Sequence, residues 1–128
     1  MMPLEPIDHA SIVCGCSFRE TLFAEAQGNY GSGPELLVIA PNADPPHALV
    51  NVGGGNLRLR PTKRIESLVY QCKVGEPFQS EWRDSEVAVL AKLQVTGAGS
   101  EACWFNGTVQ ASVARGQAEI PVKGGCGC

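Results

Sequence analysis

Short segments in which apolar and polar residues alternate recur along the whole chain. A period of two places every second side chain on the same face of a β-strand. The clearest case is residues 86–96, where apolar residues occupy five alternating positions from Val87 to Val95. This pattern predicts a long strand with one buried face and one face in water.

Seven further segments have strand composition, and turn-forming residues separate most of them. The predicted strands are residues 10–16, 35–40, 48–52, 57–60, 65–74, 86–96, 102–114 and 118–122. Residues 53–56 (Gly-Gly-Gly-Asn) predict a hairpin turn, because glycine and asparagine tolerate positive φ. Asn106 and Gly107 predict either a hairpin or a bulge in one longer strand, and we favour the bulge. Residues 78–85 are mostly polar and predict a loop.

A short helix is predicted directly after the first strand. Ser17 and Glu20 match a capping box, in which the two side chains satisfy backbone amides at a helix N-terminus. Apolar residues then recur at helical spacing as far as Gly28, which would end the helix. Continuation of the first strand through Ser17 is the alternative.

This order of elements predicts an all-β protein: a small antiparallel barrel or sandwich of about six to eight strands with at most one short helix. At 128 residues, the chain is expected to form a single domain, 1–128. Within this domain we expect a lead-in at residues 1–9 that orders late or frays, a β core at 10–122 and a Gly/Cys tail at 123–128.

Composition and charge narrow the function classes only a little. The net charge is −3 at pH 7, whereas duplex-DNA-binding domains usually carry a basic surface, so no duplex DNA partner is expected. No apolar run is long enough to span a bilayer, and no secretory signal peptide is recognisable at the start. The expected location is the cytoplasm by default, or the periplasm if a leader has been removed.

Two Cys-Gly-Cys motifs lie near the ends of the chain: Cys14 with Cys16, and Cys126 with Cys128. Residues two apart on a strand point to the same face, so pairing of the first and last strands would bring four sulfurs together. This arrangement suits cross-strand disulfides, and it also suits a thiolate site for Zn²⁺ or Cu(I). We favour disulfides, because structural zinc sites usually place two to four residues between paired cysteines.

Cys72 and Cys103 each lie in an apolar strand pattern. We favour two unbridged core thiols over a disulfide between them, because a lone buried cysteine usually behaves as a small hydrophobe.

One basic cluster follows the predicted hairpin and comprises Arg58, Arg60, Lys63 and Arg64. This cluster is a candidate site for an anion or for the phosphates of single-stranded nucleic acid. The aromatic candidates for base stacking are Tyr70, Trp82, Trp104 and Phe105. A solvated strand face balanced by nearby glutamates is the preferred interpretation, because the whole chain is acidic.

The C-terminal quarter, from Gly107 to the Gly-rich end at Cys128, resembles the ends of small uncharacterised bacterial β-rich proteins. In these proteins a last strand leads into a Gly-rich Cys-x-Cys terminus. The resemblance implies a bacterial origin and a small β-barrel, and it implies no catalytic activity.

Together these patterns predict a small non-enzymatic binding or structural β module. Its N- and C-terminal strands would be joined through the cysteine pairs at 14 and 16 and at 126 and 128. The first alternative is a thiolate metal-binding protein that holds zinc or copper; no cofactor is expected if the paired cysteines are disulfides. The second alternative is a thiol–disulfide redox protein. The sequence identifies neither a ligand nor a catalytic residue.

Overall fold

The computed structural model describes residues 3–7, 14–21, 34–63, 72–114 and 116–127, and every element that it describes is a β-strand. The strands are β1 (Gly15–Glu20), β2 (Glu35–Ala40), β3 (His47–Asn51), β4 (Asn56–Pro61), β5 (Pro77–Arg83), β6 (Ala88–Ala98), β7 (Ala102–Val113) and β8 (Gly116–Gly127). The predicted all-β class is therefore confirmed.

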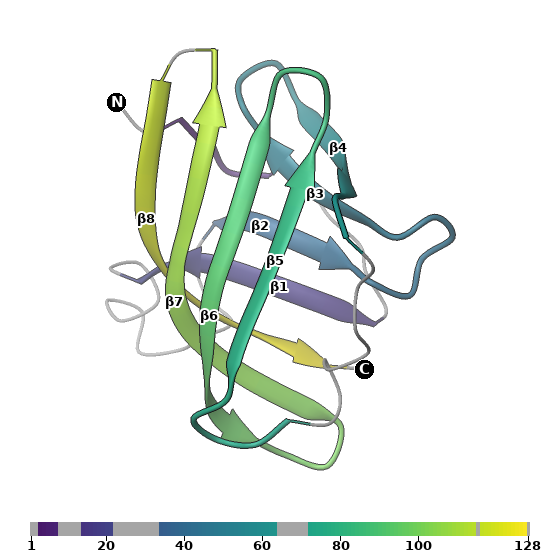
Figure 1. Ribbon diagram of the computed structural model, residues 1–128, viewed down its shortest axis with the longest axis vertical. Coiled ribbons are helices and arrows are strands. Elements are labelled where there is room, and N and C mark those ends of the chain that lie inside the picture. Colours follow the sequence, from purple (N-terminus) through teal and green to yellow (C-terminus); the bar gives the residue numbers. More distant parts are fainter. Residues whose placement is uncertain (1–2, 8–13, 22–33, 64–71, 115, 128) are drawn as a thin grey trace.

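The eight strands form one closed antiparallel barrel in which each strand pairs with its neighbours in sequence. Pairing of β8 with β1 closes the barrel, so the predicted meeting of the first and last strands is confirmed. Figure 1 shows the long strands β5 to β8 in front, with β1 and β2 crossing behind them. The last six residues of β8, Val122–Gly127, pair with β7 on one side and with β1 on the other.

Gly124 lies at the centre of this closure. It is the direct cross-strand partner of Phe105 in β7 and of Phe18 in β1. A Cβ atom at this position would overlap the carbonyl oxygen of Ser17 and would lie 2.8 Å from the Cα atom of Phe18. The two phenylalanine rings occupy the space beside the glycine, with centroids 6.2 Å apart. Closure of the barrel therefore depends on a residue without a side chain at position 124.

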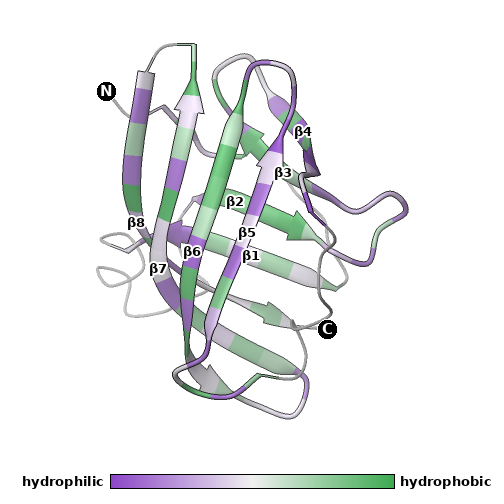
Figure 2. Cartoon of the chain, in the orientation of Figure 1, coloured by the Kyte–Doolittle hydropathy of each residue, from purple (hydrophilic) through white to green (hydrophobic). Residues whose placement is uncertain are grey.

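Side chains from alternate positions fill the interior of the barrel. In Figure 2, hydrophobic and hydrophilic residues alternate along β7 and β8, and the hydrophobic positions are the buried ones. Phe78 packs on Phe105 with ring centroids 5.4 Å apart. Trp82 is completely buried, and its indole N–H donates a hydrogen bond of 3.0 Å to the hydroxyl of Ser80. The buried indole N–H thus finds its hydrogen-bond acceptor within the same strand.

The segment before β1 packs against the barrel instead of fraying over residues 3–7. Leu4 is 2% exposed and belongs to the core. The backbone N–H of Glu5 donates to the carbonyl of Asn51 at 2.7 Å, and that of Ile7 donates to the carbonyl of Glu35 at 2.9 Å. The side chain of Asn51 adds a bond from its amide nitrogen to the carbonyl of Pro6 at 3.0 Å. The expected fraying is therefore wrong for this part of the lead-in.

The predicted helix start is also wrong, because residues 17–20 belong to β1. The competing interpretation, a continued strand, is the correct one. Phe18 is fully buried, and the strand pairs with both β2 and β8, so tertiary packing overrides the local capping signal. The remainder of the predicted helix, residues 22–28, lies outside the described residues.

Residues 78–85 were expected to form a loop, but most of them belong to β5. This strand buries Phe78 and Trp82 and turns polar residues outward, which hides its alternation in the sequence. Residues 102–113 form one continuous strand, so the predicted long strand is confirmed and the hairpin alternative is excluded. The bulge that we favoured at Asn106 and Gly107 is wrong, because both residues pair regularly with β6 and with β8. The register shift between β6 and β7 lies between Val95 and Gly97, and Asn106 pairs regularly with Gln94.

Several strand boundaries differ from the prediction, and two of the differences are large. The last strand was expected to end at Val122, but β8 continues to Gly127, because the glycines of the tail pair with both neighbouring strands. Of the predicted strand at 65–74, residues 65–71 lie outside the described residues and residues 72–74 are not in a strand.

Candidate functional site

A disulfide joins the first and last strands of the barrel. Cys16 in β1 and Cys126 in β8 are direct cross-strand partners, with Cα atoms 4.0 Å apart and an S–S distance of 2.07 Å. The two residues are 110 positions apart in sequence. The covalent link therefore lies at the one strand pair that turns the sheet into a closed barrel.

A second disulfide joins Cys72 to Cys103, with Cα atoms 6.3 Å apart. The favoured interpretation of two unbridged core thiols is therefore wrong. Cys103 is buried in β7, as the apolar pattern indicated, but Cys72 lies outside any strand and only part of it is buried. Because the position of Cys72 depends on a non-strand segment, the alternation in the sequence did not reveal that the two sulfurs meet.

The two disulfides are neighbours, because Cys126 lies opposite Cys16 on one side and opposite Cys103 on the other. These three cysteines form a row across β1, β8 and β7, and each is at most 2% exposed. A redox enzyme needs a sulfur that its partner can reach. Burial shields these three sulfurs, whereas Cys14 and Cys72 are only part-buried, so the thiol–disulfide redox alternative stays a prediction.

The zinc or copper alternative is not supported. A disulfide sulfur carries no thiolate charge with which to bind a metal ion. Cys14 is disulfide-bonded, and none of the cysteines in the described ranges is free. The same ranges contain no group of three or more His, Cys, Asp or Glu residues that could hold a metal. Cys128 lies outside them.

The basic cluster lies on the outer surface of β4 and in the turn after it. Arg58, Arg60 and Lys63 are exposed, whereas Arg64 lies outside the described residues. Pairing of β4 with β5 places Arg83 directly opposite Arg60. This addition is not predictable from spacing along the chain, because Arg83 falls in residues 78–85, for which the sequence predicts a loop. Anion binding by this cluster stays a prediction.

Of the three aromatic candidates for stacking that lie in the described residues, one is at the surface. Trp82 and Phe105 are 0% and 1% exposed and belong to the core, so their proposed role was wrong. Trp104 is 40% exposed on the outer side of β7. Tyr70 lies outside the described residues.

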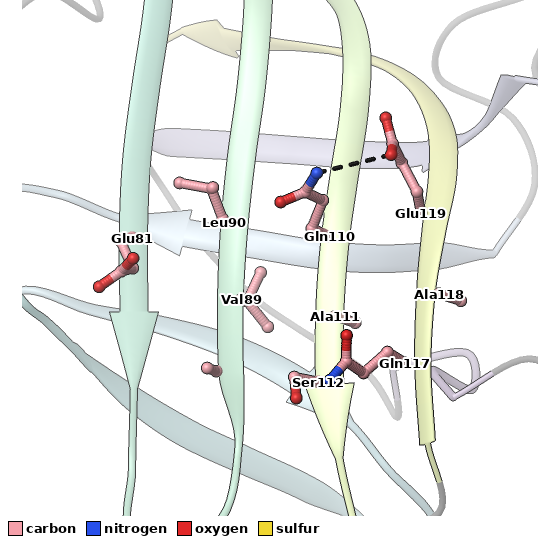
Figure 3. A pocket seen from close by; sticks show the side chains of 10 residues that line it. Glu81, Val89, Leu90, Gln110, Ala111, Ser112, Gln117, Ala118 and Glu119 are labelled. Atoms are coloured by element: carbon pink, nitrogen blue, oxygen red, sulfur yellow. Dashed lines mark hydrogen bonds between the residues drawn. The ribbon is translucent and has the colours of Figure 1, made fainter.

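One hollow of about 420 Å³ lies on the outside of strands β5 to β8. Four side chains that line it, Glu81, Leu90, Gln110 and Glu119, form a row of direct cross-strand partners. Figure 3 shows this row and the hydrogen bond of 3.5 Å from the Gln110 amide to the Glu119 carboxylate. The hollow therefore has a mixed lining: Leu90 and four smaller aliphatic side chains lie among its polar groups, and these four are Ala88, Val89, Ala111 and Ala118.

A second hollow of about 300 Å³ lies further along the same surface, over β5, β6 and β7. Gln79, Lys92, Gln94 and Asn106 contribute polar side chains to it. We use the term outer β5–β8 face for the outward side of these four strands. Sequence reasoning missed this face, because the register that brings its residues together is set by strand pairing and not by spacing along the chain.

In the described part of the chain, no helix has the length and apolar character needed to cross a bilayer. No protein-family model matches the sequence, and the searches of curated proteins and of solved structures give no match either.

Proposed function

We propose that this protein is a small non-enzymatic binding module, a disulfide-closed barrel that holds its ligand against the outer β5–β8 face. The observation that carries the proposal is the position of the hollows. Inward-facing side chains form a packed core, whereas both hollows and the exposed Trp104 lie on the outward side of the same strands. Concave, partly apolar surfaces with a few polar groups are the usual places for ligands.

The two disulfides support the scaffold part of this proposal. Side chains on paired strands of a closed sheet are held more precisely than side chains on loops. The Cys16–Cys126 bridge fixes the strand pair that closes the sheet, and the Cys72–Cys103 bridge ties β7 to the segment before β5. The face is thus presented by strands whose relative positions are cross-linked.

The same bridges support a location other than the cytoplasm expected by default. Structural disulfides persist in oxidising compartments and are rare where thioredoxin and glutathione keep thiols reduced. We propose that the module works in such a compartment. A bacterial source, which the C-terminal resemblance implies, stays a prediction.

Binding to an immobilised panel of neutral polysaccharides, heparin, single-stranded oligonucleotides and synthetic peptides tests the proposal. The face variant is Gln110→Arg, which fills the larger hollow, and the matched control is Arg58→Glu on β4. Loss of binding in Gln110→Arg but not in Arg58→Glu is the expected result. Loss in Arg58→Glu alone would move the site to the basic cluster. No binding to any member of the panel would leave only a structural role.

A further inference from the structure

Trp104 lies on the outer surface of the barrel with glycines of both neighbouring strands beside its indole ring. A Cβ atom on Gly97 in β6 would lie 3.3 Å from the Cε3 atom of the indole, and one on Gly99 would lie 3.3 Å from its Cη2 atom. On the other side, a Cβ atom on Gly125 in β8 would lie 3.3 Å from the Cδ1 atom. The benzene ring therefore covers the β6 side and the pyrrole ring covers β8.

Part of this indole is available for stacking, because Trp104 is 40% exposed. The neighbouring glycines have no side chains that could cover it. Among the described residues, the other large hydrophobic side chain with high exposure is Val74, in the turn before β5. Protein-binding interfaces usually have a core of several aromatic or aliphatic anchors. The outer β5–β8 face has one aromatic anchor and no such core.

Beyond Trp104, the outward positions of β7 carry uncharged hydrogen-bonding side chains. These are Asn106, Thr108, Gln110 and Ser112, and the neighbouring strands add Gln79 and Gln94. Amide side chains can donate and accept hydrogen bonds at the same time, and hydroxyl groups can do the same. Such groups match ligands that present many hydroxyl groups, because each ligand hydroxyl also donates and accepts.

The anchor and the two hollows follow one another along β7. The smaller hollow includes Asn106 and Gly107, and the larger includes Gln110 and Ser112. At the rise of a β-strand, the backbone from Trp104 to Ser112 extends over roughly 26 Å. This length fits an extended polymer chain better than a single small molecule.

Charges on the face have both signs. Lys123 lies opposite Asn106 near the Trp104 end, and Lys92 lies opposite Thr108 in the middle of the face. Glu81 and Glu119 border the larger hollow, and Arg83 is exposed at the end of β5. A polyanion lying along β7 would meet the two glutamates, and a polycation would meet the two lysines. Charge complementarity therefore favours a neutral chain.

We propose that the ligand of the outer β5–β8 face is a neutral glycan chain that lies along β7, with one sugar ring stacked on Trp104. The C–H bonds of a pyranose ring carry partial positive charge and meet the negative face of the indole. The hydroxyl groups of the following sugars bond to the amides and hydroxyls beyond Trp104. This inference rests on the proposed binding function and adds the class of ligand.

The test measures calorimetric binding of the intact, oxidised protein to xylan, dextran, galactomannan and hydroxyethyl cellulose. Iodide quenching of fluorescence gives a second readout. Trp82 is fully buried and inaccessible to iodide, so quenching reports on Trp104. We expect at least one of the four polysaccharides to bind and to protect Trp104 from iodide. If none binds, or if the bound polysaccharide leaves quenching unchanged, the inference is wrong.

Variants then locate the contact. We expect Trp104→Ala to weaken binding about tenfold or more and Asn106→Ala to weaken it about threefold, while Arg58→Glu has no effect. Trp104→Phe keeps an aromatic ring but a smaller one, so we expect this variant to bind more weakly than the wild type. It tests the stacking contact even if Trp104→Ala folds poorly. Wild-type affinity in both Trp104→Phe and Asn106→Ala would overturn the inference.

The proposed function and this inference fail in different ways. If heparin or a peptide binds and Gln110→Arg abolishes that binding, the proposed binding module is supported, and the inference of a neutral glycan ligand is wrong. If a glycan binds and only Arg58→Glu abolishes its binding, both are wrong.

Discussion

Replacement of Gly124 by alanine tests directly whether the closed barrel depends on close approach of β8 and β1. The new methyl group would overlap the carbonyl oxygen of Ser17 and lie 2.7 Å from Cδ1 of Phe18. The ring of Phe18 can rotate away, but the carbonyl belongs to the backbone of the neighbouring strand. The methyl group is therefore accommodated only if β1 and β8 move apart.

The expected destabilisation is large. Overpacking in a well-packed site costs about 1–3 kcal/mol, and each cross-strand hydrogen bond that is stretched or lost adds about 1 kcal/mol. We therefore expect the free energy of unfolding to fall by about 3 kcal/mol or more. Small domains have only about 5–15 kcal/mol in total, so the midpoint of thermal unfolding should fall by roughly 10–15 °C.

Gly127→Ala is the matched control, because it makes the same chemical change three residues further along β8. Its nearest contacts would be the carbonyl oxygen of Glu101 at 3.5 Å and the Cβ atom of Ala102 at 3.6 Å, which are ordinary distances. Loss of glycine flexibility in the unfolded chain would stabilise this variant by up to about 1 kcal/mol. Guanidinium unfolding of both oxidised variants provides the comparison. The reasoning is refuted if the free energies of unfolding of Gly124→Ala and Gly127→Ala agree to within about 0.5 kcal/mol, because this is the usual error of such measurements.

Three further outcomes are expected. Replacing both Cys72 and Cys103 by alanine removes the link that closes a loop of 31 residues. The free energy of unfolding in guanidinium should then fall by about 3.7 kcal/mol, and a fall of less than about 1 kcal/mol would contradict the presence of this disulfide. Asn51→Ala removes the bonds to Pro6 and to the N–H of Gly53 and should cost about 1–3 kcal/mol in the same assay, whereas an unchanged midpoint would show that the lead-in is not held there. Charge reversal at Arg58 and Arg60 together should leave binding by the outer β5–β8 face unchanged and should remove only the salt-sensitive retention on heparin that the basic cluster itself provides; unaltered retention would place heparin binding elsewhere.

The sequence predicts the fold well where one face of a strand is apolar and the other is polar. The alternation at 86–96 gave β6, and the continuous apolar run at 35–40 gave β2, whose residues from Leu36 to Ala40 are all buried. Prediction from the sequence fails for β5, because only Phe78 and Trp82 mark the buried side of this strand. Burial of this strand is decided by its two neighbours, and no local pattern contains that information.

The candidate site shows the same division. The Cys-Gly-Cys motifs indicated which strands meet, because their spacing places sulfurs on one face and the closure brings them together. The Cys72–Cys103 bridge and the contacts of Trp104 with glycines of the neighbouring strands could not be predicted. Each depends on which residue lies opposite which, and a one-residue change of register would turn each side chain to the other side of the sheet.

Closure through β8 also decides what an unclosed chain would do. Before β1 and β8 pair, the sheet has two open edges, and an open edge is a template for another strand. The edge residues of β8 are the same in every copy, so they fit β1 of a second molecule as well as their own. Exchange of the last strand between two copies is therefore the reaction that competes with closure. Once formed, the bond from Cys16 to Cys126 commits each chain to its own barrel and so acts against domain swapping.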